Sequence, residues 1–173
     1  MGYTHYYPQS RDFSKDEWKA VKDGARKAVR HCQRRGIGLA RDWDGGSPSV
    51  TDRSITLNGA GESGCETFYL PRLKEPRFDS LNDVESLGVG LGVGLGDRPR
   101  PVRPPEPKFQ FCKTGGRPYD LAVCLILLVA SSAAPGALEV GSDGDWDNDW
   151  AEARDAYREI FGLEPVPFGI PAG

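Results

Sequence analysis

The stretch "FCKTGGRPYDLAVCLILLVASSAAPG", Phe111–Gly136, decides the fold because it joins a short strand to the most apolar run of the chain. Phe109–Cys112 alternates in polarity as a strand does, and Pro118 suits the first turn of a helix. Tyr119–Ser132 is apolar on every side, and a Pro-Gly pair follows it. The pattern predicts a strand, a polar turn and a buried helix.

Composition limits the partners of this chain. Leu121–Ala134 is shorter than the ~20 apolar residues that a membrane-spanning helix needs, so we expect a core helix and no membrane. The 173 residues carry 22 Lys and Arg against 25 Asp and Glu, a net charge of −3. No basic field favours nucleic acid, and we expect none as a partner.

Upstream, Ser14–Arg35 has helical periodicity, with Ser14 and Glu17 at the spacing of a capping box and Gly36 after the end. One face of this predicted helix is strongly basic. It is either a solvated face or an anion-binding strip. The strip consists of Lys15, Lys19, Lys22, Arg26, Lys27, Arg30 and Arg34.

The remaining elements are short strands and one more helix. Strand-like runs separated by turn formers favour antiparallel pairing. We expect an α+β fold, a mostly antiparallel sheet with about three helices packed on it, as a two-layer single domain over 1–173. The predicted strands are Gly2–Tyr7, Gly36–Ala40, Ser54–Asn58, Glu66–Leu70 and Ala137–Val140, and the last helix is Trp146–Phe161.

A glycine- and proline-rich segment, "SLGVGLGVGLGD" followed by "RPRPVRPPEPK", interrupts this pattern. Alternate glycines raise the entropy lost on ordering, and prolines favour extended, unpaired backbone. We expect a flexible insertion at about 80–107. Its proline- and arginine-rich half makes a protein-interaction scaffold a further alternative function.

Three motif matches are rejected on their context. "GAGESG", Gly59–Gly64, precedes a strand, whereas a dinucleotide fingerprint must open a helix. "DGDWDND", Asp143–Asp149, lacks the glycine and final glutamate of a calcium loop. "CKTGG", Cys112–Gly116, lacks the upstream glycine of a phosphate loop. No nucleotide or calcium site follows from these matches.

The four cysteines form no CxxC pair, and only two histidines are present. A structural zinc is therefore not expected. Met1–Ser10 lacks the basic flank and apolar core of a secretory signal, so we expect reduced thiols and a cytoplasmic protein.

The polar turn before the buried helix is the first candidate site. Helix N-termini present unpaired N–H groups, and Lys113 and Arg117 could hold an anion there together with them. The alternative is that Thr114 caps the helix, Asp120 favours its dipole and the cations are solvated.

Further candidates cluster near other turns. Asp143 or Asp145 is expected to cap the last helix, which leaves the other aspartates of that segment unexplained. His5 is the natural proton-transfer group, with a structural role as the alternative. Cys112 is interpreted as a buried strand-end cysteine rather than a nucleophile. An oxygen-rich magnesium or manganese site stays open at Glu62, Glu66 and Asp143.

Four stretches together resemble a family of small proteins of phages, bacteria and fungi. They are "GYTHYY", "NGAGESGCETF", "FCKTGGRPYD" and "SDGDWDNDW". Members usually have "GYTHYW" and "FCKTARKPYD"; this chain has Tyr7 for Trp, Gly115 and Gly116 for Ala-Arg, and Arg117 for Lys. The resemblance supplies no chemistry. It implies as functional residues Tyr3, His5, Asn58, Glu66, Lys113, Tyr119, Asp120, Ser142 and Asp143.

Two functions are favoured. The first is binding of a small anionic metabolite, for example a nucleotide derivative, in a pocket of strand ends and helix N-termini. The alternative is an enzyme that acts on such a compound by general acid/base catalysis. The catalytic candidates are His5, Glu66 and Lys113. The ligand-binding candidates are Tyr3, Asn58, Glu62, Thr114, Arg117, Tyr119, Asp120, Ser142, Asp143 and Trp146. The sequence names no metal ligand, cofactor or oligomeric state.

Overall fold

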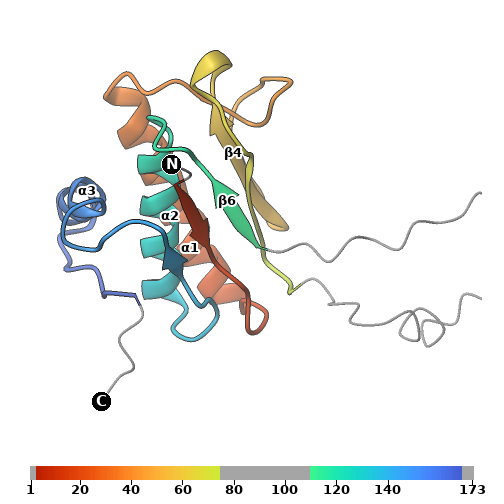
Figure 1. The fold of residues 1–173 in the computed structure, drawn as a ribbon. Helices are drawn as coiled ribbons and strands as arrows, with labels where there is room; N and C mark the ends of the chain where they lie inside the picture. The colour runs from red at the N-terminus through yellow and green to blue at the C-terminus, as the bar shows by residue number, and fades with distance from the viewer. Residues whose placement is uncertain (1–2, 75–109, 169–173) are drawn as a thin grey trace, which may run out of the picture. The chain divides into compact units, whose positions relative to one another are not determined.

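The computed structural model describes residues 3–74 and 110–168. Figure 1 shows these residues as strands with the helices on one side of them, and the predicted α+β class is confirmed. The insertion predicted at about 80–107 lies outside the described residues. In chain order the elements are β1 (Thr4–Tyr6), α1 (Lys15–Arg34), β2 (Leu39–Ala40), β3 (Ser49–Val50), β4 (Ser54–Gly59), the 3-10 helix η1 (Gly61–Ser63), β5 (Phe68–Pro71), β6 (Phe111–Lys113), α2 (Asp120–Ala133), β7 (Gly141–Ser142) and α3 (Ala151–Phe161).

The strands form two antiparallel sheets. One has the order β6-β1-β7, and the other has the order β2-β4-β3 with β5 also paired to β4. Within the first sheet, His5 is the register partner of Cys112 on one side and of Ser142 on the other. This central place of β1 brings together residues that are more than a hundred positions apart in the chain.

Helix α1 begins as its sequence predicts. The Ser14 hydroxyl accepts a hydrogen bond from the Glu17 backbone N–H, and the Glu17 carboxylate accepts one from the Ser14 backbone N–H. This reciprocal capping box satisfies two backbone donors at the start of the helix. The apolar face of α1 then packs into the core through residues such as Trp18, Val21 and Ala25.

The capping box makes one pH-dependent prediction. The Arg11 guanidinium, followed by the Ser14 backbone N–H, lowers the pKa of Glu17 from its ordinary 4.5 to about 2. A carboxyl group with a lowered folded-state pKa stabilises fully above its unfolded pKa and loses that contribution as the pH falls through the folded pKa. We therefore expect the stability difference between the wild type and Glu17→Gln to shrink as the pH falls from 4.5 to 2.

Urea unfolding midpoints across this pH range measure the effect. Glu139→Gln removes an exposed carboxylate outside the capping box and serves as the control for the loss of one negative charge. A difference between wild type and Glu17→Gln that stays constant down to pH 2 would contradict the assignment.

Helix α2 is the centre of the core. Its residues from Leu121 to Ala130 are all buried, and it packs against both α1 and α3. Gly24 of α1 permits a close approach, because a Cβ atom there would lie 2.4 Å from Val129 Cγ1. The uniformly apolar sequence of α2 is explained by neighbours on every side.

The C-terminal third differs from its predicted course. Helix α3 begins at Ala151 rather than Trp146, and Trp150 at its N-cap makes no side-chain capping bond. The predicted cap at Asp143 or Asp145 was wrong, because the Asp145 carboxylate instead accepts from the backbone of Asp147 and Asn148 in a local turn. The strand expected at 137–140 is a bridge at Leu138, and β7 follows it.

Among residues 3–74 and 110–168, no helix combines the length and apolar character needed to cross a membrane. This holds for α2 despite its composition.

Candidate functional site

His5 lies at the centre of the candidate site. Its side chain is 0% exposed and contacts Asp120 and Cys124 of α2. The ring meets Tyr3 edge-on at 5.0 Å between centroids and Trp150 at 5.1 Å. These contacts fix the plane of the imidazole, so both ring nitrogens have defined directions.

Both nitrogens of His5 are hydrogen-bonded. Nε2 lies 2.7 Å from Asp120 Oδ1, and Nδ1 lies 3.0 Å from Ser142 Oγ. The Gly144 backbone N–H donates to Ser142 Oγ, which leaves the serine hydroxyl proton free to donate to Nδ1. We therefore assign the ring proton to Nε2, where it is donated to the Asp120 carboxylate.

Asp120 is the first residue of α2, a position at which the helix dipole favours a carboxylate. Oδ1 also accepts a hydrogen bond from the buried Thr114 hydroxyl. Gly115 and Gly116, with φ of +64° and +66°, let the chain turn from β6 into the helix that carries Asp120. The carboxylate is oriented by two donors while its side chain stays 18% exposed.

Cys124 lies one helical turn beyond Asp120. Its Sγ donates to Asp120 Oδ2 at 3.5 Å and lies 3.6 Å from His5 Nε2. Burial, followed by the charge of Asp120, raises the pKa of the Cys124 thiol well above its usual value. The thiol is therefore a weak donor to the carboxylate and not a thiolate nucleophile.

His5, Asp120 and Cys124 could also be considered as metal ligands, since one ligand atom from each lies within 4.8 Å of the others. The distances from Cys124 Sγ to Asp120 Oδ2 and to His5 Nε2 suit ligands of a tetrahedral zinc ion. The 2.7 Å between Nε2 and Oδ1 is a hydrogen-bond distance, whereas two such ligands of zinc lie ~3.3 Å apart. A zinc ion could bind here only if it replaced the proton between Nε2 and Oδ1 and moved these two atoms apart.

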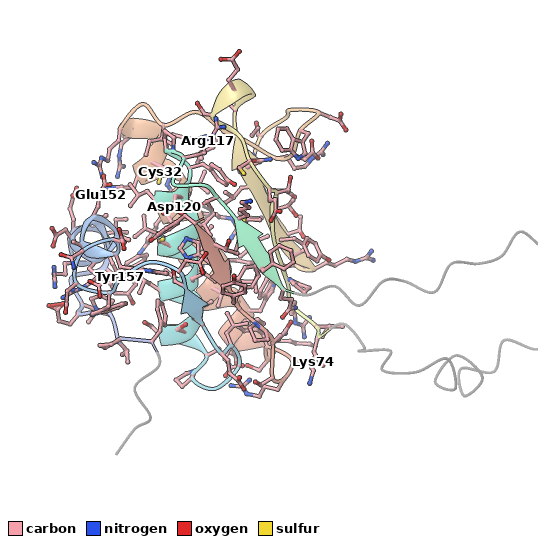
Figure 2. All side chains as sticks on the ribbon, in the orientation of Figure 1. Cys32, Lys74, Arg117, Asp120, Glu152 and Tyr157 are labelled. Carbon is pink, nitrogen blue, oxygen red and sulfur yellow. The ribbon has the colours of Figure 1, made fainter. Side chains whose placement is uncertain are left out.

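A cavity of about 140 Å³ opens beside Asp120, between the N-terminal ends of α2 and α3, and we name it the α2–α3 cavity. Figure 2 shows Arg117 and Asp120 near the start of α2 and Glu152 on α3. The charged groups that line the α2–α3 cavity are one guanidinium and three carboxylates. The full lining is Gly116, Arg117, Pro118, Asp120, Leu121, Cys124, Asp149, Glu152 and Ala153.

The other two predicted catalytic residues lie elsewhere. Lys113 is exposed and is the residue after Cys112, the register partner of His5, so it lies on the opposite face of the strand. Its backbone N–H donates to Glu66 Oε2 at 2.8 Å. Glu66 and Lys113 thus pair with each other, and neither lines the α2–α3 cavity.

Asn58 and Glu62, both predicted ligand contacts, belong to one turn. Asn58 is fully buried; its amide group donates to the Cys65 carbonyl at 3.0 Å and accepts from the Gly59 N–H at 2.8 Å. Further bonds to Thr67 and to the Cys65 N–H complete its set. Glu62 is exposed on η1, and its carbonyl accepts from Arg117.

Tyr119, Asp143 and Trp146 also have structural partners. The buried Tyr119 hydroxyl donates to the Glu66 carbonyl at 2.7 Å. Asp143 extends the β1–β7 pairing, because its carboxylate accepts from the Thr4 N–H at 3.1 Å. Trp146 stacks on Trp150 at 6.1 Å between centroids.

Tyr3 has the least satisfied polar group near His5. Its hydroxyl oxygen is buried and makes no hydrogen bond with a described residue. Burial, with smaller contributions from Cys124 and Asp120, raises the pKa of Tyr3, while the nearby Ser142 hydroxyl favours the phenolate without reaching hydrogen-bond geometry. The hydroxyl is a protonated donor beside the His5 cluster.

Four neighbours of the site were not predicted from the sequence: Cys124, Asp149, Trp150 and Glu152. The four-residue spacing of Asp120 and Cys124 on one predicted helix was a usable signal. Trp150 lies within the predicted helix Trp146–Phe161, and no local pattern indicates that α3 faces the start of α2.

The cysteines provide a chemical check on this arrangement. Burial raises the pKa of Cys32 to about 11 and of Cys112 to about 12, and it also raises that of Cys124. Cys65 is only half-buried. We expect brief alkylation of the native protein, followed by peptide mass spectrometry, to modify Cys65 first; equally fast labelling of Cys112 or Cys124 would contradict the packing around His5.

Comparison with protein-family models, with curated proteins and with solved structures finds no match to this chain. The family resemblance of the four sequence stretches therefore stays a prediction.

Proposed function

We propose that this protein is an enzyme that transfers a proton to or from a small molecule bound in the α2–α3 cavity. Asp120 is the group that exchanges the proton. One observation carries the proposal: Asp120 lines the cavity and its Oδ1 lies 2.7 Å from the Nε2 of a fully buried histidine. A carboxylate that is held by buried donors and is also open to a cavity suits repeated proton exchange.

His5 acts as a positioning residue in this proposal, because it has no exposed surface and does not line the cavity. Its Nε2–H and the Thr114 hydroxyl hold Asp120 in one orientation. As a base, Asp120 takes a proton from the substrate, and as an acid it returns that proton to another substrate atom or to water. The Nε2–H bond stabilises the carboxylate before the transfer.

The lining of the cavity indicates the class of substrate. Asp149 and Glu152 can accept hydrogen bonds from hydroxyl or amino groups, and Arg117 can bind one acidic group. The volume of about 140 Å³ is below the ~300 Å³ at which pockets for whole ligands begin. We infer a small polar compound of which one end enters the cavity.

The test exposes the full chain to a pool of nucleotides, sugar phosphates and amino sugars. Mass spectrometry of retained and released compounds identifies any that change. We expect wild type and Asp143→Asn to convert the same compound and Asp120→Asn to leave it intact. A compound that the wild type retains without change would contradict catalysis and favour a binding protein.

A further inference from the structure

A second cavity, of about 250 Å³, lies between the C-terminal half of α1 and the end of α3. We name it the α1–α3 cavity. Three of its basic residues follow the three- and four-residue spacing that places side chains on one helix face. Its lining is Lys27, Arg30, His31, Arg34, Glu159 and Ile160.

The basic residues of this cavity differ from their neighbours on α1 in their partners. Lys22 forms an ion pair with Asp52, and Arg26 forms one with Asp23. The cations that line the cavity make no ion pair with a described residue, although the Lys27 ammonium lies 5.6 Å from the centroid of the Phe161 ring. Three cations against the single carboxylate of Glu159 leave a net positive lining.

His31 adds a buried ring nitrogen that has no hydrogen-bond partner among the described residues. This nitrogen is Nε2, and the side chain is only 4% exposed. Nδ1 lies 3.9 Å from a Glu159 carboxylate oxygen, which is too long for a hydrogen bond. A buried polar atom without a partner is unfavourable, and the imidazole that carries this atom lines the cavity.

We propose that the α1–α3 cavity binds a phosphate group, either as inorganic phosphate or as the phosphate of a small monoester. A guanidinium group is positively charged, and its planar set of N–H donors can bind two phosphate oxygens at once. The C-terminal end of a helix dipole disfavours an anion, so binding must depend on the side chains and not on backbone amides. The site is separate from the α2–α3 cavity and does not depend on the catalytic proposal.

Titration of the ¹⁵N-labelled full chain tests the site at constant ionic strength in a phosphate-free buffer. The probes are inorganic phosphate, AMP and adenosine, and the signals are those of the His31 ring. We expect saturable shifts with phosphate and AMP but not with adenosine. Tighter binding of AMP than of phosphate would assign a monoester as the ligand, and similar binding would assign free phosphate.

A matched pair of variants distinguishes a site from a diffuse charge. Arg30→Gln combined with Arg34→Gln removes two cations of the cavity, and Lys15→Gln combined with Lys19→Gln removes two exposed cations of α1 outside it. The first pair should weaken phosphate binding by about tenfold or more, as expected for lost charge-assisted hydrogen bonds. The second pair should stay within about twofold.

Two results would overturn the proposal. One is the absence of saturable shifts at His31 with phosphate and AMP. The other is an equal loss of affinity in both variant pairs, which would indicate nonspecific attraction to a basic helix. Both variant pairs change exposed side chains, so they should fold, and unchanged thermal unfolding would verify it.

Discussion

Replacement of Asp120 by Asn is expected to lower kcat/KM by about 10²- to 10⁴-fold on the compound that the wild type converts, the range attributed to general acid–base catalysis. The amide has the shape of the carboxylate, and its oxygen can still accept from His5 Nε2–H and Thr114. It cannot take up a proton at neutral pH. The loss should therefore occur without a change in fold.

The control for this prediction is Asp143→Asn. It makes the same chemical change in a residue that supports β1 and does not line the α2–α3 cavity. Steady-state kinetics should show near-wild-type turnover for this control, with similar thermal unfolding for both variants. An Asp120→Asn protein that keeps its turnover within about twofold would contradict proton exchange at Asp120.

Replacement of Asn58 by Ala is expected to produce a large loss of stability, about 3–5 kcal/mol. The amide satisfies four polar groups in the turn between β4 and β5, and none of its surface is exposed. Alanine would leave these groups without their partner in the interior. Such a loss is a large part of the ~5–15 kcal/mol that separates folded from unfolded domains.

Urea unfolding measures this free energy. Asn148→Ala is the control, because Asn148 is exposed and its amide bonds to Asp145 at the surface. It should change stability by less than ~0.5 kcal/mol. If Asn58→Ala kept wild-type stability, the residue would be free to contact a ligand, as predicted from the sequence, and its structural assignment would be wrong.

The helices were predictable where local chemistry and packing agree. Ser14 and Glu17 determine the start of α1 by their own hydrogen bonds, so the capping box was visible in the sequence. The apolar run after Asp120 has to be buried on every side, and this alone predicts α2. Both signals depend on neighbours in the chain.

Elements that depend on distant partners were less predictable. Strands β3 and β7 have two residues each, too few to show alternation, and they exist through pairing with β4 and β1. Helix α3 starts later than predicted because the Asp145 carboxylate accepts hydrogen bonds from the following backbone and forms a turn. This turn competes with helix formation at that position. Residue preferences near Trp146 do not distinguish these outcomes.

Several residues of the candidate site were predicted from the sequence, but their arrangement in space was not. His5, Asp120 and Ser142 were all among the candidates, yet their contact depends on β1 lying between β6 and β7. Lys113 and Cys112 are neighbours in sequence, and strand register decides which of them shares a face with His5. Register depends on residues that are distant in the chain. The sequence alone therefore could not show that Glu66 and Lys113 lie away from His5.

The hydrogen bond between His5 Nε2 and Asp120 is tested by ¹⁵N NMR of the His5 ring in the full chain at about pH 8, above the usual histidine pKa. We expect a proton on Nε2 and none on Nδ1. We also expect that Asp120→Asn shifts the Nε2–H signal and that Asp143→Asn does not. A ring proton on Nδ1, or an Nε2 signal that is unchanged in Asp120→Asn, would contradict the hydrogen bond on which the site depends.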